Sequence, residues 1–365
     1  MTRNRFEQII SSLHFVDNAT IDTTDRLCKV RPLFDHFSKN FAEMAEPVPA
    51  TWAIDEAMEP YFGRHSLKQF IRGKPVRFGY KFWCLCSREG AIIRFKLYEG
   101  KDTGRDASMG VGESVVTNMA LNFVPKGSSG FVDNYFTALP LLQKFQNAGI
   151  NLTGTLRKDR IRSVPLTDYS KVQRGEAEVL AVVHWQDNSD VIVGTNETEG
   201  SALALGKCNR WSAKHKKVVS MCQPKVIQKY NHGMGGVDLF DQFRAKYRIA
   251  FRKRVWYYPI FRFLLNATLV NGWLCYGKIK QQTQLEFTQQ IVSSLLTPLS
   301  GIATKNHVPR PISESRRYDG INHNIVMGPT QRRCGMCKKN VRPMCTKCDV
   351  ALHVQCWLQY HTPRK

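Results

Sequence analysis

Long hydrophobic runs are absent from this sequence. The most apolar stretch, residues 261–276, contains Arg262, Asn266 and Asn271, and it falls short of the roughly 20 residues that a membrane-spanning helix needs. Residues 1–8 carry charges where a secretory signal peptide has its apolar core. These absences predict neither a membrane protein nor a secreted one, and we expect a soluble intracellular chain.

Acidic residues are also scarce. The chain has 30 Asp and Glu against 53 Lys and Arg, a formal net charge of +23 and a pI near 9.7. An excess of this size is typical of proteins that bind polyanions. Ribosomal, chromatin and membrane-surface proteins share this excess of positive charge. The charge therefore indicates the class of binding partner, and it does not indicate a reaction.

Cysteine is sparse until the end of the chain, where it becomes dense. Cys334, Cys337, Cys345, Cys348 and Cys356 crowd together, and with His353 and His361 they give seven candidate metal ligands. Thiolates two residues apart chelate tetrahedral zinc, and so short a segment lacks a core of its own. Disulfides are the weaker alternative in an intracellular chain.

An interleaved pair of zinc sites is expected in this segment. One ion would take Cys334, Cys337, His353 and Cys356, and the other would take Cys345, Cys348 and His361. Because two tetrahedral sites need eight ligands, one ligand is shared, missing, or supplied by a group that the spacing does not identify.

The rest of the chain is long enough for two or three domains. Apolar spacing predicts helices over 5–15 and 30–44, then strands over 52–55, 77–86 and 91–98, a helix over 112–123, a strand over 129–133, a helix over 138–148 and a strand over 150–156. A later helix carries Asp238. This is the element order of an α/β, ribonuclease H-like fold.

Residues 158–225 interrupt that order, and their alternation over 178–185, 191–195 and 216–221 predicts an inserted β-rich domain. The loops 158–163 and 214–217 are basic. A phosphate contact and a solvated loop explain them equally well.

Four aspartates are candidate catalytic residues. Asp238 and Asp241 lie on one face of a helix entered through paired glycines, Gly235 and Gly236, whose role we expect to be conformational. Capping of the helix is the common explanation for such acids. Asp55 and Asp133, however, each follow a short apolar strand, and a metal-dependent nuclease needs carboxylates from separate elements.

Four motifs together resemble the piggyBac family of DNA transposases and its domesticated derivatives. They are the stretches 52–56 (WAIDE), 74–81 (KPVRFGYK), 132–137 (VDNYFT) and 230–242 (YNHGMGGVDLFDQ). The resemblance runs from about Met1 to the C-terminus, and its specificity comes from the whole set in this order.

The resemblance implies that Asp55, Asp133 and Asp238 are the catalytic acids, with Asp241 as an auxiliary one. Asp55 would bridge two Mg²⁺ (or Mn²⁺) ions, and Asp133 and Asp238 would each hold one. The implied reaction nicks an element end, forms a hairpin and joins DNA at TTAA targets. The implied partner is double-stranded DNA, bound by a homodimer in the nucleus.

A segment of mixed cations and aromatic rings follows the acids. Arg252, Lys253, Arg254 and Trp256 are candidate DNA-binding residues, because cations neutralise phosphates and rings stack on bases. Trp256 fits a helix core equally well. The helices predicted over 256–280 and 288–296 would fold back on residues 1–50 as a DNA-binding and dimerisation domain, and the zinc module would recognise terminal DNA, with protein or chromatin binding as the alternative.

The resulting domain prediction has seven segments. A helical DNA-binding and dimerisation domain is formed by 1–50 and 248–297, a ribonuclease H-like core by 51–157 and 226–247, a β-rich insertion by 158–225, a linker by 298–331 and a zinc-binding domain by 332–365. The family carries more of the first helical segment and an acidic N-terminal region. Two interpretations therefore stay open: an active transposase, or a truncated or domesticated copy that binds DNA without catalysis.

Overall fold

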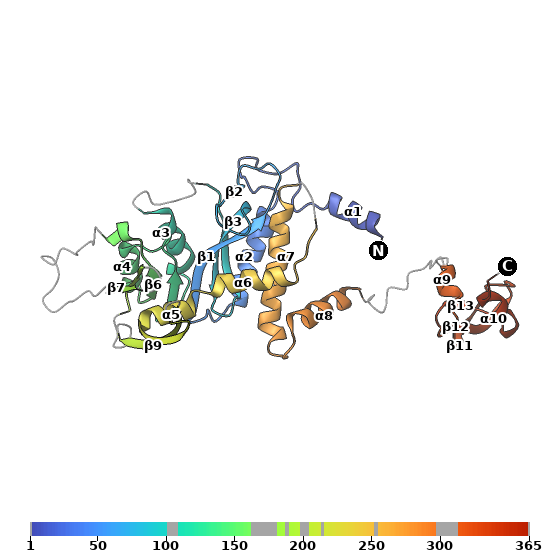
Figure 1. The fold of residues 1–365 in the computed structure, drawn as a ribbon. Helices are drawn as coiled ribbons and strands as arrows, with labels where there is room; N and C mark the ends of the chain where they lie inside the picture. Colours follow the sequence, from blue (N-terminus) through green and yellow to red (C-terminus); the bar gives the residue numbers. More distant parts are fainter. Residues whose placement is uncertain are drawn as a thin grey trace, which may run out of the picture. The chain divides into compact units, whose positions relative to one another are not determined.

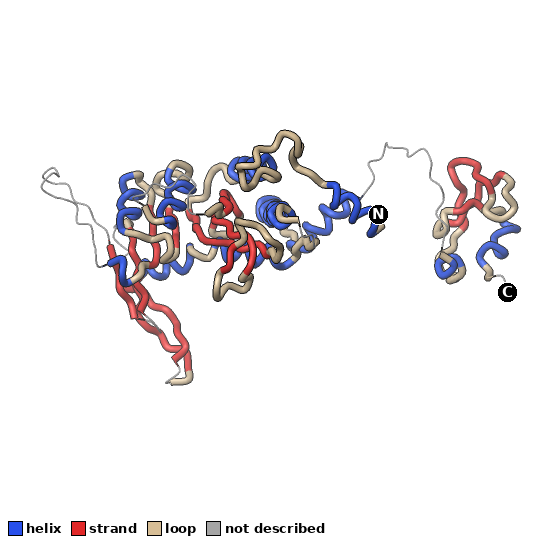
Figure 2. Tube along the Cα trace, turned by 90° about the horizontal axis from the view of Figure 1, so that it is seen from above, coloured by secondary structure: helices blue, strands red, loops and turns tan. Residues whose placement is uncertain are grey.

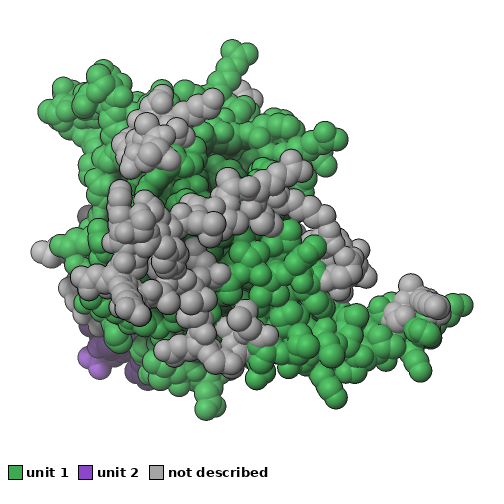
Figure 3. Space-filling model, turned by 90° about the vertical axis from the view of Figure 1, so that its left-hand side faces the viewer, with its two compact units in different colours: residues 1–296 green, residues 297–365 purple. Residues whose placement is uncertain are grey.

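The computed structural model describes residues 2–100, 109–161, 181–186, 190–197, 204–212, 215–251, 255–296 and 313–363 (Figure 1). The chain divides into two compact units, residues 1–296 and residues 297–365, which Figure 3 colours separately. Within the described ranges, no helix combines the length and apolar character needed to cross a bilayer.

An eight-stranded sheet forms the centre of the first unit. Its strands run in the order β2 (Gln69–Phe70), β3 (Phe78–Ser87), β1 (Thr51–Pro60), β5 (Ser129–Val132), β6 (Asn151–Thr155), β8 (Asp190–Thr195) and β7 (Ala181–Gln186), and β4 (Ile92–Leu97) pairs with β3. β1, β5 and β6 are parallel, and the other pairs are antiparallel. The expected mixed α/β fold is therefore present.

The predicted order of strands and helices from 51 to 156 is observed, with the short β2 as an addition. The turn between β3 and β4 contains Gly90 at φ +90°, a backbone conformation that glycine adopts without strain. The predicted helix over 112–123 consists of α3 (Val111–Val116) and a π-helical turn (Thr117–Leu121), and it is followed by β5 and α4 (Leu139–Asn147).

Alternate side chains of β3 enter two different cores, because successive residues of a strand point to opposite faces. Trp83 and Leu85 pack with residues of α3 and α4. Phe82 and Cys84 pack with residues of α2 (Arg31–Met44), α6 (Gly236–Lys246) and α7 (Tyr258–Gly272). The sheet is thus covered on both faces, and α6 lies against β1 and β3.

The N-terminal helices pack on α7, as the sequence predicted. The Tyr258 hydroxyl donates to the carbonyl of Ile10 in α1 (Arg3–Ser12), and Phe15 packs edge-on against Tyr257 at 5.9 Å between ring centroids. Together with α8 (Gln284–Leu296) these helices belong to the first unit. Their expected role in DNA binding and dimerisation stays a prediction.

The segment predicted as a separate insertion is organised differently. β8 pairs with β6 and β7 pairs with β8, so these two strands extend the central sheet. Pairing partners distant in sequence decide this, and strand periodicity does not reveal them. β9 (Leu205–Ser212) and β10 (Lys217–Pro224) form a two-stranded sheet of their own and lead into α5 (Lys225–Gly233), a helix that the sequence analysis missed.

The second unit begins earlier than predicted. Within the segment expected to be a linker, 298–331, residues 313 onward contain α9 (Glu314–Arg317) and β11 (Ile325–Arg333). β11 pairs with β12 (Asn340–Cys345), which pairs with β13 (Val350–Ala351) ahead of α10 (Val354–His361). The polar composition of 313–331 suggested a linker because these elements are short and largely exposed.

Candidate functional site

Asp55 and Asp133 lie beside each other on neighbouring parallel strands. The register of β1 against β5 places Ile54 opposite Val132, so the two aspartates that follow come together where β5 ends. The prediction that Asp55 ends its strand is wrong, because β1 continues to Pro60 and is paired with β3 beyond Asp55.

Asp238 enters from the first turn of α6. A Cβ atom on Gly236 would lie 2.4 Å from the Ser87 carbonyl oxygen, so glycine is required for α6 to begin this close to the end of β3. The carboxylate of Asp238 does not cap its helix, and it forms no hydrogen bond or ion pair with any residue in the described ranges. The capping explanation therefore fails for Asp238.

The three acids share one electrostatic environment. Burial, with nearby carboxylates including Asp133, raises the pKa of Asp55 to about 7. Burial also raises the pKa of Asp133. The hydroxyl of Tyr230 on α5 is influenced by all three aspartates, and burial together with their charges raises its pKa to about 12. Tyr230 therefore stays protonated at neutral pH.

Backbone N–H groups donate to one oxygen of the Asp55 carboxylate and to one oxygen of the Asp133 carboxylate. Asp55 Oδ1 accepts the Glu56 backbone N–H at 2.7 Å, and Asp133 Oδ1 accepts the Tyr135 N–H at 2.8 Å. The nearby cation Lys74 pairs with Glu56 at 3.3 Å. Burial opposes the charge on Lys74, but Glu56 and Asp55 outweigh it and raise the pKa of Lys74, so this side chain is charged at neutral pH.

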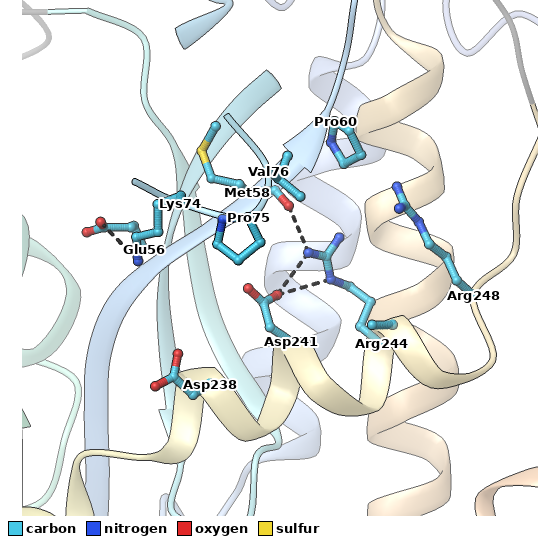
Figure 4. A pocket seen from close by; sticks show the side chains of 11 residues that line it. Glu56, Met58, Pro60, Lys74, Pro75, Val76, Asp238, Asp241, Arg244 and Arg248 are labelled. Carbon is cyan, nitrogen blue, oxygen red and sulfur yellow. Dashed lines mark hydrogen bonds and ion pairs between the residues drawn. The ribbon is translucent and has the colours of Figure 1, made fainter. Parts of the chain in front are cut away.

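A pocket with a volume of about 330 Å³ opens between β1, residues 74–76 and α6. Figure 4 shows Asp238 and Asp241 extending from α6 toward β1, with Lys74 and Glu56 beside the pocket. Its lining residues are Glu56, Met58, Pro60, Lys74, Pro75, Val76, Asp238, Asp241, Arg244, Ala245 and Arg248.

One buried carboxylate near this pocket was not predicted. Glu59 on β1 is fully buried and contacts three arginines. Arg244 of α6 donates to one oxygen, and Arg248 and Arg262 Nε donate to the other at 2.7 and 2.6 Å. We name these four residues the Glu59 hub. It connects the strand of Asp55 to the helix of Asp238 and to α7.

Asp241 lies next to the Glu59 hub and is paired with one of its members, Arg244. Its Oδ1 accepts from Arg244 Nη2 at 2.9 Å and from Arg244 Nε at 3.2 Å. Burial raises the pKa of Asp241, and Arg244 opposes that rise. The carboxylate is thus held in an ion pair within its own helix, whereas Asp55, Asp133 and Asp238 are not paired with a cation within the described ranges.

The three unpaired aspartates do not form a tight cluster of oxygen atoms. In the part of the chain that the structure describes, two groups of possible ligands have all their ligand atoms within 4.8 Å of one another, and both lie in the second unit. The acids are brought to one edge of the sheet and left apart.

Of the predicted DNA-binding residues, Arg252, Lys253 and Arg254 lie outside the described residues. Trp256 stacks on His65, with ring centroids 4.2 Å apart and planes within 10°, and it packs against the core shared by α2 and α7. Trp256 therefore packs within the fold, and its stacking on DNA bases stays a prediction.

The two ligand groups of the second unit are complete sets of four. The first contains Cys334, Cys337, His353 and Cys356, as predicted. The second contains Cys345, Cys348 and His361, as predicted, together with His323, which supplies the eighth ligand. Sequence spacing missed His323 because it lies 22 residues before Cys345, next to β11, in the segment expected to be a linker.

The histidines of the second group are also oriented by hydrogen bonds. His323 Nδ1 lies 3.3 Å from Cys345 Sγ while its Nε2 lies 3.0 Å from Asp319 Oδ1. His361 Nδ1 lies 3.0 Å from the Trp357 carbonyl oxygen, which leaves Nε2 for a metal. A carboxylate or carbonyl on the second ring nitrogen is the usual support for a metal-bound histidine. These groups could hold zinc.

Comparisons with known proteins agree with this architecture. A family model described as Transposase IS4 matches residues 1–273. The chain is 40% identical over 385 residues to PiggyBac transposable element-derived protein 3 of Homo sapiens, covering 99% of this chain and 63% of that protein. It is 32% identical over 376 residues to PiggyBac transposable element-derived protein 2 of Homo sapiens, covering 98% and 63%.

The chain thus spans about 63% of the length of these relatives. Among solved structures, it resembles a piggyBac transposase, determined by cryo-electron microscopy as a synaptic complex with hairpin DNA. The TM-score is 0.61 at 19% identity, and the match covers 98% of this chain and 80% of that one. This likeness concerns the fold.

Proposed function

Since the chain belongs to the piggyBac-type transposase family, we propose that it cleaves DNA strands and transfers them to TTAA targets with a divalent metal. The observation that carries the proposal is that Asp55, Asp133 and Asp238 lie at one edge of the sheet without cationic partners in the described ranges. The order of β4, β3, β1, β5 and β6 supports a ribonuclease H-like core.

The acids fit a divalent cation. Burial away from water raises the pKa of Asp55, and the neighbouring carboxylates Glu56 and Asp133 raise it further. A bound cation would offset both effects. Mg²⁺ or Mn²⁺ would be held by Asp55 between two sites and by Asp133 and Asp238 at one each. When bound, the metal would stabilise the charge on the attacking and leaving oxygens of a phosphodiester.

The remaining side chains act through charge and hydrogen bonding. Lys74 is charged and lies beside the acids, where its ammonium group can contact a DNA phosphate. Tyr230 keeps its proton and can donate a hydrogen bond to a phosphate oxygen. Arg244, which pairs with Asp241, donates to the Met58 carbonyl and to Glu59 and so holds the pocket-facing side of α6 against β1.

The second unit completes the proposal. Its two groups of four ligands would each take one zinc ion, which would stabilise a segment with a very small apolar core. We assign it the recognition of transposon-end DNA, with the whole protein acting as a dimer in the nucleus.

A supercoiled plasmid that carries transposon ends flanked by TTAA tests the proposed activity. In Mg²⁺ or Mn²⁺ the full chain should nick it, and Asp133→Asn should reduce nicking by at least about 100-fold while DNA affinity is kept, because the loss is confined to the acid that binds metal. Asp35→Asn, at an exposed position of α2, is the matched control and should nick normally.

A second function is favoured by the names of the relatives, which are transposable element-derived proteins. It is DNA binding by the same fold without cleavage. Equal residual nicking in wild type and Asp133→Asn, with DNA still bound by both, would favour it and overturn the catalytic proposal.

A further inference from the structure

The sheet of β9 and β10 is a ribbon, residues 205–224, whose strands pair only with each other within the described ranges. Figure 2 shows a pair of strands extending beyond the other elements of the first unit. The base of the ribbon is fixed: Trp185 Nε1 donates to the Cys222 carbonyl at 3.1 Å, and Gln228 Nε2 donates to the Lys207 carbonyl at 3.0 Å. The ribbon is therefore attached at its base to β7 and α5.

One face of the ribbon is open to solvent. In β9 the exposed side chains alternate with half-buried ones, and in register across from them β10 exposes Val218, Ser220 and Cys222. Trp211 is 64% exposed, and its partner Val218 is 59% exposed. A large aromatic ring paired with a branched aliphatic side chain on an open face is a feature of interaction surfaces.

The charge of this part of the chain has one sign. No Asp or Glu occurs between Glu199 and Asp238. The cations in and next to the ribbon are Lys207, Arg210, Lys214, Lys216, Lys217 and Lys225. Lys207, Lys216 and Lys217 are exposed, and within the described ranges no carboxylate pairs with them. A surface of this kind attracts a polyanion and repels a basic partner.

We propose that the exposed face of the ribbon lies in the major groove of duplex DNA, a proposal that rests on DNA being the substrate in the proposed function. The major groove of B-form DNA admits a two-stranded β-ribbon. Lys207, on this face, and Lys217, which is exposed at the tip of the ribbon and points to the opposite face, would contact phosphates on the two edges of the groove. Trp211 with Val218 would contact the apolar edges of bases. A-form RNA, whose major groove is narrow and deep, would not accept the ribbon.

Charge-matched variants of the full chain provide the test. Lys207→Gln with Lys217→Gln removes two ribbon cations. The control variant, Arg88→Gln with Lys126→Gln, removes two exposed cations near the edge of the sheet where β1 and β5 begin, outside the helices predicted to bind DNA. Binding to a 30-base-pair duplex, measured by fluorescence anisotropy over a salt series, gives the number of phosphates neutralised. The ribbon variant should lower the slope of log K against log salt by about 1.8, since each phosphate contact contributes about 0.9.

If the ribbon variant and the wild type bind equally at 1 M salt, this change in slope makes the variant bind roughly 60-fold more weakly at about 0.1 M salt. The control variant should leave the slope unchanged. Dimethyl sulfate, which reacts with guanine N7 in the major groove, reports on the groove. Wild type and the control variant should protect N7, and Trp211→Ala should lose that protection without loss of fold, because Trp211 is exposed.

Equal slopes for the two charge variants would overturn the proposal, and so would unchanged N7 protection in Trp211→Ala. Failure of the full chain to bind duplex DNA, or binding of duplex RNA with equal affinity, would also overturn it. The two proposals fail separately. A protein that binds through the ribbon and never nicks DNA refutes the proposed catalysis alone. A protein that nicks DNA with equal slopes refutes the ribbon alone.

Discussion

Replacing Glu59 by glutamine should destabilise residues 1–296 by about 3–5 kcal/mol, the usual cost of removing one partner from a buried ion pair. Glu59 is fully buried, and Arg244 and Arg262 beside it are only 8% and 12% exposed. Glutamine keeps the size of the side chain, but its amide group presents N–H donors to guanidinium donors. With Asp241 included, two carboxylates against three arginines become one against three.

Urea unfolding at pH 7 measures this loss. Tryptophan fluorescence reports mainly on the first unit, since Trp357 is the one tryptophan of the sequence beyond residue 296. Glu43→Gln is the matched control: it removes the same charge from an exposed pair with Lys39 at 3.7 Å and should change the free energy of unfolding by no more than about 0.5 kcal/mol.

The physical reason is tested by a double-mutant cycle. In an Arg244→Met background one donor to Glu59 is already gone, so Glu59→Gln should cost less than it does in the wild type. A loss under about 1 kcal/mol in the wild-type background, or the same loss in both backgrounds, would refute the reasoning that Glu59 stabilises the fold by compensating buried arginines.

Three further changes follow from named contacts. Burial raises the folded-state pKa of Asp55 from 3.8 to about 7, so between these pH values the folded state binds more protons than the unfolded state. The free energy of unfolding without metal should therefore fall as the pH rises from about 4 to 7. Urea midpoints measured over this range should fall less in Asp55→Asn. His323→Ala should lower the zinc content of the protein by one ion, measured by native mass spectrometry, whereas His14→Ala should not, since His323 completes one group of four ligands. Asn196→Ala should cost about 2–4 kcal/mol in urea unfolding, because the buried amide accepts from the Leu152 N–H and donates to the Leu142 and Ile150 carbonyls. Asn147→Ala, at an exposed position of α4, is its control.

The elements that the sequence predicted best are those with strong local periodicity. Alternation along 77–86 predicted β3, and the structure shows why: Phe82 and Trp83 enter opposite cores. Helical spacing predicted α1, α2 and α7. The approach of Asp55 to Asp133 followed from their places after two apolar strands, because adjacent parallel strands bring equivalent positions together.

The features that were missed depend on partners distant in sequence. The pairing of β6 with β8 joins residues about forty apart, and nothing local distinguishes it from pairing within an insertion. Glu59 meets arginines nearly 200 residues away. The available signal was a third acid, after Asp55 and Glu56, in a short strand whose other residues are mostly apolar. His323 gave no spacing signal, because a ligand brought in by the chain before β11 follows no short motif.

The two sets of acids near the pocket differ in a way that stability alone does not explain. Glu59 and Asp241 are compensated by arginines, so their burial is balanced within the fold. Asp55 and Asp133 lie half-buried beside each other with no ion pair in the described ranges, and burial raises the pKa of each. A fold able to place three arginines around one carboxylate could have neutralised these as well. Leaving them uncompensated destabilises the apo protein and suits carboxylates that receive their positive charge from a bound ion.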